Sequence, residues 1–538
     1  MAIERWEPRE ELTRQEELLL KRLDRVRKLL GFLRLHRRRL FDDAFQAELA
    51  GMYRDTGAGK EARPPALMAM ATYVQAYLQV SDAEMVELTV VDLRVQMVLG
   101  CLGAVKPAFS QGALCDFRER LIHTDMDRRL LERTVELARE LGGFDWKKLP
   151  RSLRVAVDSS PFEGAGRVED TFNLLGHAAR KVVTCAASLL RWRPTTVAER
   201  AGAEMLLMPS IKVALDIDWS DPTEKADALT TLVKQLDALE SWVERHIPAE
   251  AQPELAPHLA TLRQVRSQDI EETPRTKVPR IRQGVAEDRR VSIEDAEMRH
   301  GRKTASYTFN GYKRHIATDL DAGLIVAVAV TPANRPEHTA LPVLQDDLEC
   351  QHIEVEELYV DRAYVASDFV EHVLAGGGEV ICRPWQTTNR GLFPKSAFDI
   401  NIRDRTITCP QGQTQAFPLG FGSSVGFDAA ICDRCPMRKR CTTGARGRGR
   451  RVWIAEDEAL QQRLRKLTAT PSGRARIRER VPVEHRLAHI ASRQGPRARY
   501  RGVRKNTFDL RRAAALQNLE AAHRYAREGS PGGCRRAA

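Results

Sequence analysis

Two aspartates, Asp158 and Asp361, each follow a run of residues that is typical of a buried β-strand. Asp158 comes after "LRVAV" (153–157), and Asp361 comes after "LYV" (358–360). A carboxylate placed beside buried strands costs free energy unless a partner compensates. If the two strands are neighbours, their carboxylates meet at one edge of the sheet and repel, and a divalent cation relieves this repulsion. For either residue alone, the usual alternative is a turn or N-cap aspartate.

A helix would complete such a site by supplying a third carboxylate. The candidate is Glu484 in "RERVPVEHRLAHIASRQ", where Pro482 suits the first turn of a helix. Carboxylates that hold two Mg²⁺ ions can activate a nucleophile and stabilise the leaving oxygen of a phosphodiester. Glutamates are common on helices, so Glu484 is a candidate ligand only in combination with the two aspartates.

Four cysteines gather in one part of the chain. Cys432 and Cys435 form a C-x-x-C pair, Cys441 follows closely, and Cys409 lies upstream in "TCP". Four thiolates with this spacing predict a tetrahedral Zn²⁺ site, which would stabilise a stretch with little apolar content. The alternatives are a redox pair or unliganded thiols.

The charge balance is basic, with a net charge of +12 and a pI near 9.3, which favours polyanionic partners, nucleic acid first. Arginine and lysine are dense from Gly473 to Lys505, on both sides of Glu484. A second basic stretch, "HGRKTASYTFNGYKRH", adds tyrosine and phenylalanine. We expect these segments to contact DNA phosphates, the alternatives being a solvated helix face and an ordinary edge strand. The DNA-binding candidates are Lys303, Lys313, Arg314, Arg480, Arg499, Tyr500, Arg501, Arg504 and Lys505.

The order of elements predicts an α/β fold. A strand ending at Asp158 is followed by a hairpin within 305–331, a helix, a strand ending at Asp361, a helix and a further strand. Hairpins give antiparallel neighbours and helical crossovers give parallel ones, so we expect a mixed sheet flanked by helices.

The predicted boundaries follow from changes in composition. Residues 1–147 form a helical N-terminal domain with probable DNA-end binding. The catalytic core comprises 151–385 and 473–527, with a helical insertion at about 186–290. Residues 386–472 form a Cys-rich insertion, and 528–538 a disordered tail. The start of the chain is too charged for a signal peptide, and with unpaired cysteines this predicts a cytoplasmic protein.

Several segments together resemble bacterial insertion-sequence transposases of the DDE class. They are "RPPALMAMATYVQAYLQVSDAEMVELTVVDLRVQMVLG", "VAVDSSPFEGAGRVEDTFNLLG", "DAEMRHGRKTASYTFNGYKRHIATDLDAGLIVAVAVTPAN", "LYVDRAYVAS" and "VEHRLAHIASRQGPRARYRGVRKNTFDLRRAAALQNL". The resemblance implies an RNase H-like core, an all-α N-terminal transposase domain and a zinc-ribbon-like Cys-rich segment. It also implies that Asp158, Asp361 and Glu484 are the catalytic triad.

Related transposases often place tyrosine, arginine and lysine around the glutamate helix. Arg480 fits the arginine and would position the scissile phosphate. Ile477 and Ala491 stand at the other two positions, so the chain departs from the pattern there, and Tyr500 or Lys505 are substitutes.

The implied function is binding of transposon ends followed by DNA cleavage and strand transfer with two Mg²⁺ ions, or Mn²⁺. A homodimer at the nucleoid is expected by analogy, because two DNA ends must be brought together. The alternatives are an RNase H-like nuclease that only hydrolyses, and a catalytically silent DNA-binding protein derived from a transposase.

Overall fold

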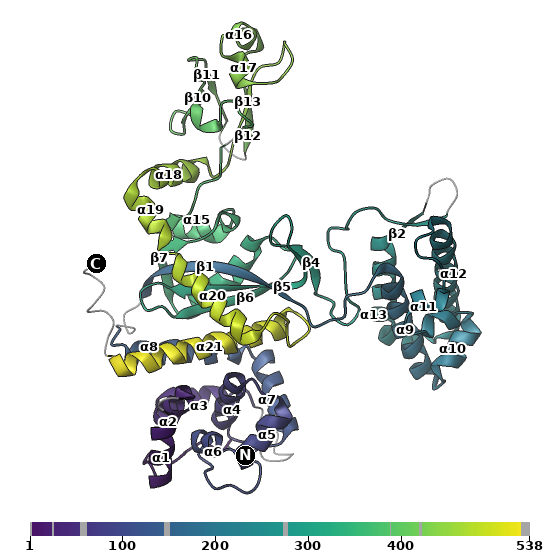
Figure 1. Cartoon of the computed structure of the whole chain (residues 1–538), viewed down its shortest axis with the longest axis vertical. Coiled ribbons are helices and arrows are strands. Elements are labelled where there is room, and N and C mark those ends of the chain that lie inside the picture. Colours follow the sequence, from purple (N-terminus) through teal and green to yellow (C-terminus); the bar gives the residue numbers. More distant parts are fainter. Residues whose placement is uncertain are drawn as a thin grey trace.

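A mixed β-sheet lies at the centre of the molecule (Figure 1). The computed structural model describes residues 3–23, 26–53, 62–144, 151–272, 278–387, 389–418 and 422–528. The strands of this sheet are β1 (Arg151–Glu163), β4 (Arg299–Arg302), β5 (Thr308–Asp319), β6 (Ile325–Pro332), β7 (Ile353–Tyr359) and β8 (Glu379–Ile381). The predicted mixed α/β architecture is thereby confirmed.

The strand order places β1 between an antiparallel and a parallel neighbour. β5 runs antiparallel to β1, while β7 and then β8 run parallel on the other side. β4 and β6 share the far edge of β5, β4 pairing with its first residues and β6 with the rest. The alternating and continuous apolar runs of these segments bury both faces of the sheet, as expected for strands covered by helices.

β1 is longer than the sequence predicted. The prediction that it ends at Asp158 is wrong, because β1 continues through a segment of small and polar residues to Glu163. The reason is its partner: pairing with β5 extends from Val155↔Asp319 to Glu163↔Gly311, so tertiary hydrogen bonding overrides weak local propensity. Asp158 therefore lies inside a strand.

The helices that cover the sheet are the crossover helices between its strands and the helices of the C-terminal segment. The crossovers after β6 and β7 are α14 (Leu341–Cys350) and α15 (Asp368–Ala375). The C-terminal helices are α18 (Glu458–Ala469), α19 (Pro471–Arg478), α20 (Val481–Gln494) and α21 (Val503–Glu528). α20 crosses β1 and β5, and α21 packs between β6 and α8 (Met126–Leu141), as Figure 1 shows.

The N-terminal region is entirely helical in its described part. Besides α8 it contains α1 (Arg14–Leu23), α2 (Lys28–Leu40), α3 (Asp43–Ala50), α4 (Pro65–Leu78), α5 (Asp82–Val91), α6 (Leu93–Leu99) and α7 (Gln111–His123). Ser81 and Ser110 accept backbone hydrogen bonds at the starts of α5 and α7, as N-cap residues do. Its apolar side chains belong to the same core as the sheet, so α21 joins the two parts. Residues 145–147 of the predicted domain lie outside the described residues.

A helical body with a core of its own separates β1 from β4. It contains α9 (Thr171–Leu190), α10 (Pro194–Ala201), α11 (Ile211–Leu215), α12 (Pro222–His246), α13 (Gln252–Asp269) and the short pair β2 (Ile270–Glu272) and β3 (Pro279–Ile281). Its first helix starts fifteen residues before position 186, the expected start of the insertion.

A third, smaller core follows β8 and extends away from the sheet (Figure 1). It contains β9 (Asp399–Asn401), β10 (Thr406–Thr408), β11 (Thr414–Ala416), β12 (Ser423–Gly426), β13 (Arg451–Ile454) and the short helices α16 (Ala429–Arg434) and α17 (Arg438–Cys441). Among the described residues, eight buried apolar side chains make up this core. The predicted tail lies almost wholly outside the described residues. Among the helices that the structure describes, none is long and apolar enough to cross a membrane.

Candidate active site

The sheet brings Asp158 and Asp361 to equivalent positions on neighbouring parallel strands. The last residues paired between β1 and β7 are Ala156 and Tyr359. Asp158 lies two residues beyond Ala156 and Asp361 two residues beyond Tyr359, so the two aspartates continue the same register. Asp361 ends its strand as predicted and caps the short 3₁₀ turn η4 (Arg362–Tyr364), accepting a 2.6 Å hydrogen bond from the amide of Arg362.

Arg480 links the third predicted carboxylate to the first. Its guanidinium Nη1 lies 3.6 Å from Asp158 Oδ1, and its Nη2 lies 3.1 Å from Glu484 Oε1. Arg480 and Glu484 are four residues apart at the start of α20 and therefore share one helix face. Pro482 stands in the first turn of that helix, as predicted. α20 thus presents one cation and one carboxylate to the end of the sheet.

Burial and charge act in opposite directions on these groups. Burial raises the pKa of Asp158, whereas Arg480 and the amide of Ser159 lower it. Burial also disfavours the charged form of Arg480, but Asp158, Glu484 and Asp361 outweigh it and raise the pKa of the guanidinium. Glu484 is half exposed. Arg480 therefore interacts electrostatically with all three predicted catalytic carboxylates.

A buried polar chain supports the strand that carries Asp158. His315 of β5, opposite Ser159 in the register, contacts the Tyr364 hydroxyl at 2.8 Å through Nδ1 and the Thr331 hydroxyl at 2.9 Å through Nε2. Burial lowers the pKa of His315 to about 3, so its ring is neutral and fixed by two hydroxyl groups. Sequence reasoning missed this chain, although Tyr364 stands in the "DRAY" motif that follows Asp361.

The donor chemistry suits magnesium, but the acids are not arranged around one point. Oxygen ligands from one or two carboxylates are what Mg²⁺ prefers. Within the described ranges, however, no three His, Cys, Asp or Glu side chains are close enough to hold a metal ion together. Arg480, whose Nη1 is buried without a hydrogen-bond partner, lies between Asp158 and Glu484 instead. The carboxylate oxygens are thus suitable ligands for Mg²⁺, and the positive charge between Asp158 and Glu484 comes from Arg480.

The basic candidates beside the core strands have different surroundings. Arg314 is only 1% exposed, donates to Gln494 Oε1 and the Pro161 carbonyl, and lies over the Phe162 ring, so it supports the interior and does not face DNA. Lys313 donates to the Arg335 carbonyl at 2.9 Å. Lys303 is exposed in the turn between β4 and β5.

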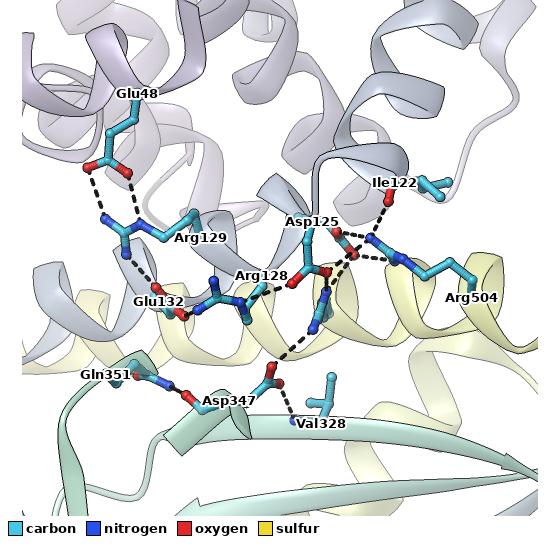
Figure 2. A network of polar contacts seen from close by, with 12 residues as sticks. Glu48, Ile122, Asp125, Arg128, Arg129, Glu132, Val328, Asp347, Gln351 and Arg504 are labelled. Atoms are coloured by element: carbon cyan, nitrogen blue, oxygen red, sulfur yellow. Dashed lines mark hydrogen bonds and ion pairs between the residues drawn. The ribbon is translucent and has the colours of Figure 1, made fainter. Parts of the chain in front are cut away.

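Most candidates at the start of α21 are bonded to carboxylates of other segments. Arg501 pairs with Glu294 at 2.6 Å, and Lys505 pairs with Glu119 at 2.7 Å. Arg504 pairs with Asp127 at 2.5 Å (Figure 2). Tyr500 packs against Phe508 and under Arg118, whereas Arg499 is exposed. This basic run therefore joins α21 to the N-terminal helices, a use that charge density alone did not reveal.

The four predicted zinc ligands line one cavity of about 410 Å³ in the small core. Cys409, Cys432 and Cys441 also pack against its apolar residues. Burial raises the pKa of the Cys441 thiol, and so do the three other thiols. The chain thus gathers four soft donors, although without the closeness of a formed metal site.

Comparisons with known proteins match two segments of the chain to transposase families. Residues 21–120 match the family described as "Transposase domain (DUF772)", and residues 408–523 match the family described as "Transposase DDE domain". The second segment contains Glu484 and the four cysteines, whereas Asp158 and Asp361 lie outside both segments. No curated protein and no solved structure matches the chain significantly. The two family matches are consistent with an insertion-sequence DDE transposase, and they confirm the predicted resemblance.

Proposed function

We propose that the protein binds the ends of its insertion sequence and catalyses DNA cleavage and strand transfer on an RNase H-like core. The strand order supports this core: an antiparallel β6-β5-β1 meander continues into the parallel strands β7 and β8. The protein acts as a homodimer, because each active site handles one DNA end.

The observation that carries the proposal is the register of the two aspartates. Asp158 and Asp361 continue the parallel pairing of β1 and β7, and α20 brings Glu484 and Arg480 to Asp158. Asp361 follows the C-terminal end of β7, and Asp158 lies at the same level within the longer β1. The C-terminal ends of parallel strands are where α/β proteins commonly bind ligands.

Each residue has a distinct part in this proposal. Asp158, Asp361 and Glu484 would hold two Mg²⁺ ions, and these ions would supply activation of the attacking oxygen and stabilisation of the leaving oxygen. Arg480 holds the scissile phosphate by paired N–H donors. Tyr364 and His315 fix the strand beneath Asp158. In strand transfer, a free 3′-hydroxyl attacks phosphorus, and the P–O3′ bond of the target strand breaks in line.

The first experiment replaces one carboxylate. We expect Asp158→Ala to abolish Mg²⁺-dependent cleavage at the ends of the element while leaving DNA binding intact. The matched control is Asp399→Ala, at an exposed position of β9, which should cleave like the wild type. Full cleavage by Asp158→Ala would refute the assignment of the active site.

A second assay separates transposition from simple hydrolysis. Pre-cut DNA ends carrying a free 3′-hydroxyl are incubated with a target plasmid, and joined products are measured. We expect the wild type to join the ends. Cleavage of uncut ends with no joined product would instead identify a nuclease.

A further inference from the structure

A basic cleft lies on the side of α20 that faces away from the carboxylates. It has a volume of about 830 Å³ and is bordered by α20, the C-terminal half of α21, the start of α2 and the end of α4. It therefore lies at the junction between the N-terminal helices and the catalytic core. None of the DNA-binding residues predicted from the sequence lines it.

Positive charge dominates the lining of the cleft. The basic residues are Arg27, Lys28, Arg486 and Arg524, together with His485, His489 and His523. Glu520 is the one acid among the described lining residues, and it is already bonded to Arg493 at 2.8 Å. The basic run at the start of α21, by contrast, is largely neutralised by carboxylates. The cleft thus differs from that segment in having a single carboxylate among its described lining residues.

The exposure of the basic side chains in the cleft indicates which class of ligand it binds. Lys28 and Arg524 are exposed, and neither forms an ion pair with a carboxylate in the described part of the chain. Small-molecule sites enclose most of their ligand, whereas this cleft presents its cations at the surface. Exposed lysine and arginine along the lining of a cleft suit a polymer with regularly spaced negative charges.

The helix α20 connects the cleft to the active site. His485 directly follows Glu484, and His485 and His489 share a face that lies about 140° around the helix from Arg480 and Glu484. From Glu484 to His489 the helix rises about 7.5 Å, comparable to two nucleotide steps of about 3.4 Å along one strand. A DNA strand that leaves the carboxylates over the start of α20 would enter the cleft.

We infer that this cleft binds the phosphate backbone of the DNA that flanks the active site, an inference that rests on the proposed function. In this arrangement the N-terminal helices and the catalytic core contact the same DNA duplex at the junction between them. Because the contacts are to phosphates, this binding is independent of sequence and decreases steeply with salt.

The test compares two charge reversals of equal size. Lys28→Glu with Arg524→Glu changes the cleft, and Lys234→Glu with Arg245→Glu changes the exposed surface of α12. Fluorescence anisotropy measures the affinity of each full-length protein for a short random-sequence duplex across a range of salt concentrations. The measured quantity is the slope of log affinity against log salt concentration. Each phosphate contact contributes about 0.9 to the steepness of this slope, so we expect the slope of the cleft variant to be shallower than that of the wild type by about two. The α12 variant should keep the wild-type slope.

Each outcome has a definite meaning. A reduced slope in the cleft variant alone supports the inference. Equal slopes in the cleft variant and the wild type overturn it, and so does an equal loss in both variants, while Mg²⁺-dependent cleavage by the wild type would still support the proposed function. A wild type that neither binds nor cleaves DNA refutes the proposed function, and the inference with it.

Discussion

At the scale of single residues, Arg480 is the group on which the candidate active site depends. It lies close to Asp158 and Glu484 and interacts electrostatically with Asp361 as well. An arginine in this place offsets the same carboxylate repulsion that a divalent cation would offset. The guanidinium and the cation therefore compete for the same acids, and binding of a phosphate would draw the arginine away from them.

This competition predicts the effect of removing the charge. We expect Arg480→Gln to bind Mn²⁺ more tightly than the wild type, by about tenfold, which corresponds to about 1.4 kcal/mol. Isothermal titration of the DNA-free protein with Mn²⁺ measures the affinity independently of cleavage.

The control for this prediction is Arg476→Gln, one helical turn earlier. Arg476 pairs with Glu357 and Glu379, outside the carboxylate site, so its loss should leave the Mn²⁺ affinity unchanged. An Arg480→Gln variant that binds Mn²⁺ no better than the wild type would show that the arginine does not compete with the ion.

At the scale of secondary-structure elements, the Cys-rich core is the part that most needs an additional constraint. Its strands are three or four residues long, and its eight buried apolar residues are few for a stable fold. Four thiols around one cavity offer that constraint as a structural Zn²⁺ site. The thiols would have to lose protons and move closer together when zinc binds.

We therefore expect the purified protein to contain about one zinc ion per chain. Cys435→Ser should lose that zinc and make residues 386–472 sensitive to protease, whereas Cys350→Ser, in the exposed end of α14, should change neither property. Metal analysis by mass spectrometry and limited proteolysis measure the two effects. Equal zinc content in all three proteins would contradict the site.

The predictions from sequence succeeded where a local pattern determines the element. The alternation of apolar residues predicted β1, β5, β6 and β7, and Pro482 predicted the start of α20. The predictions failed where a residue distant in the sequence determines the length of a strand or the surroundings of a side chain. The extension of β1 beyond Asp158 depends on β5, and the burial of Arg314 depends on Gln494 of another helix. Arg504 looked like a DNA contact because its carboxylate partner, Asp127, lies 377 residues away in the sequence.

At the scale of the whole molecule, an ionic network with a buried centre ties three parts of the chain together (Figure 2). Arg511 of α21 donates to Asp125 at 2.5 Å, at the start of α8, and to Asp347 of α14 at 3.0 Å. Arg129 continues the network to Glu48 of α3 at 2.9 Å. The network therefore fixes the N-terminal helices to the core across α21, and with them the two sides of the basic cleft.

The buried centre of the network predicts a large loss of stability when one partner is removed. Arg511→Met leaves Asp347 and Asp125 without their common cation, and breaking a buried pair in this way costs about 3–5 kcal/mol. Burial already raises the pKa of Asp347 to about 6, so its ionised form destabilises the fold even beside Arg511. Because this pKa lies above the ordinary value of 3.8, stability decreases as the pH rises from about 3.8 to about 6. The loss in Arg511→Met should therefore be greater at about pH 8 than at about pH 5.

Urea unfolding at the two pH values measures this dependence, with Arg245→Met on the exposed face of α12 as the control. The double variant Arg511→Met with Asp347→Asn removes the uncompensated charge while keeping an acceptor for the amide of Val328. It should recover part of the stability and lose most of the pH dependence, because an amide does not ionise. If Arg511→Met unfolds at the same urea concentration as the control at both pH values, the network does not hold the N-terminal helices to the core. Other contacts would then have to hold together the two sides of the basic cleft.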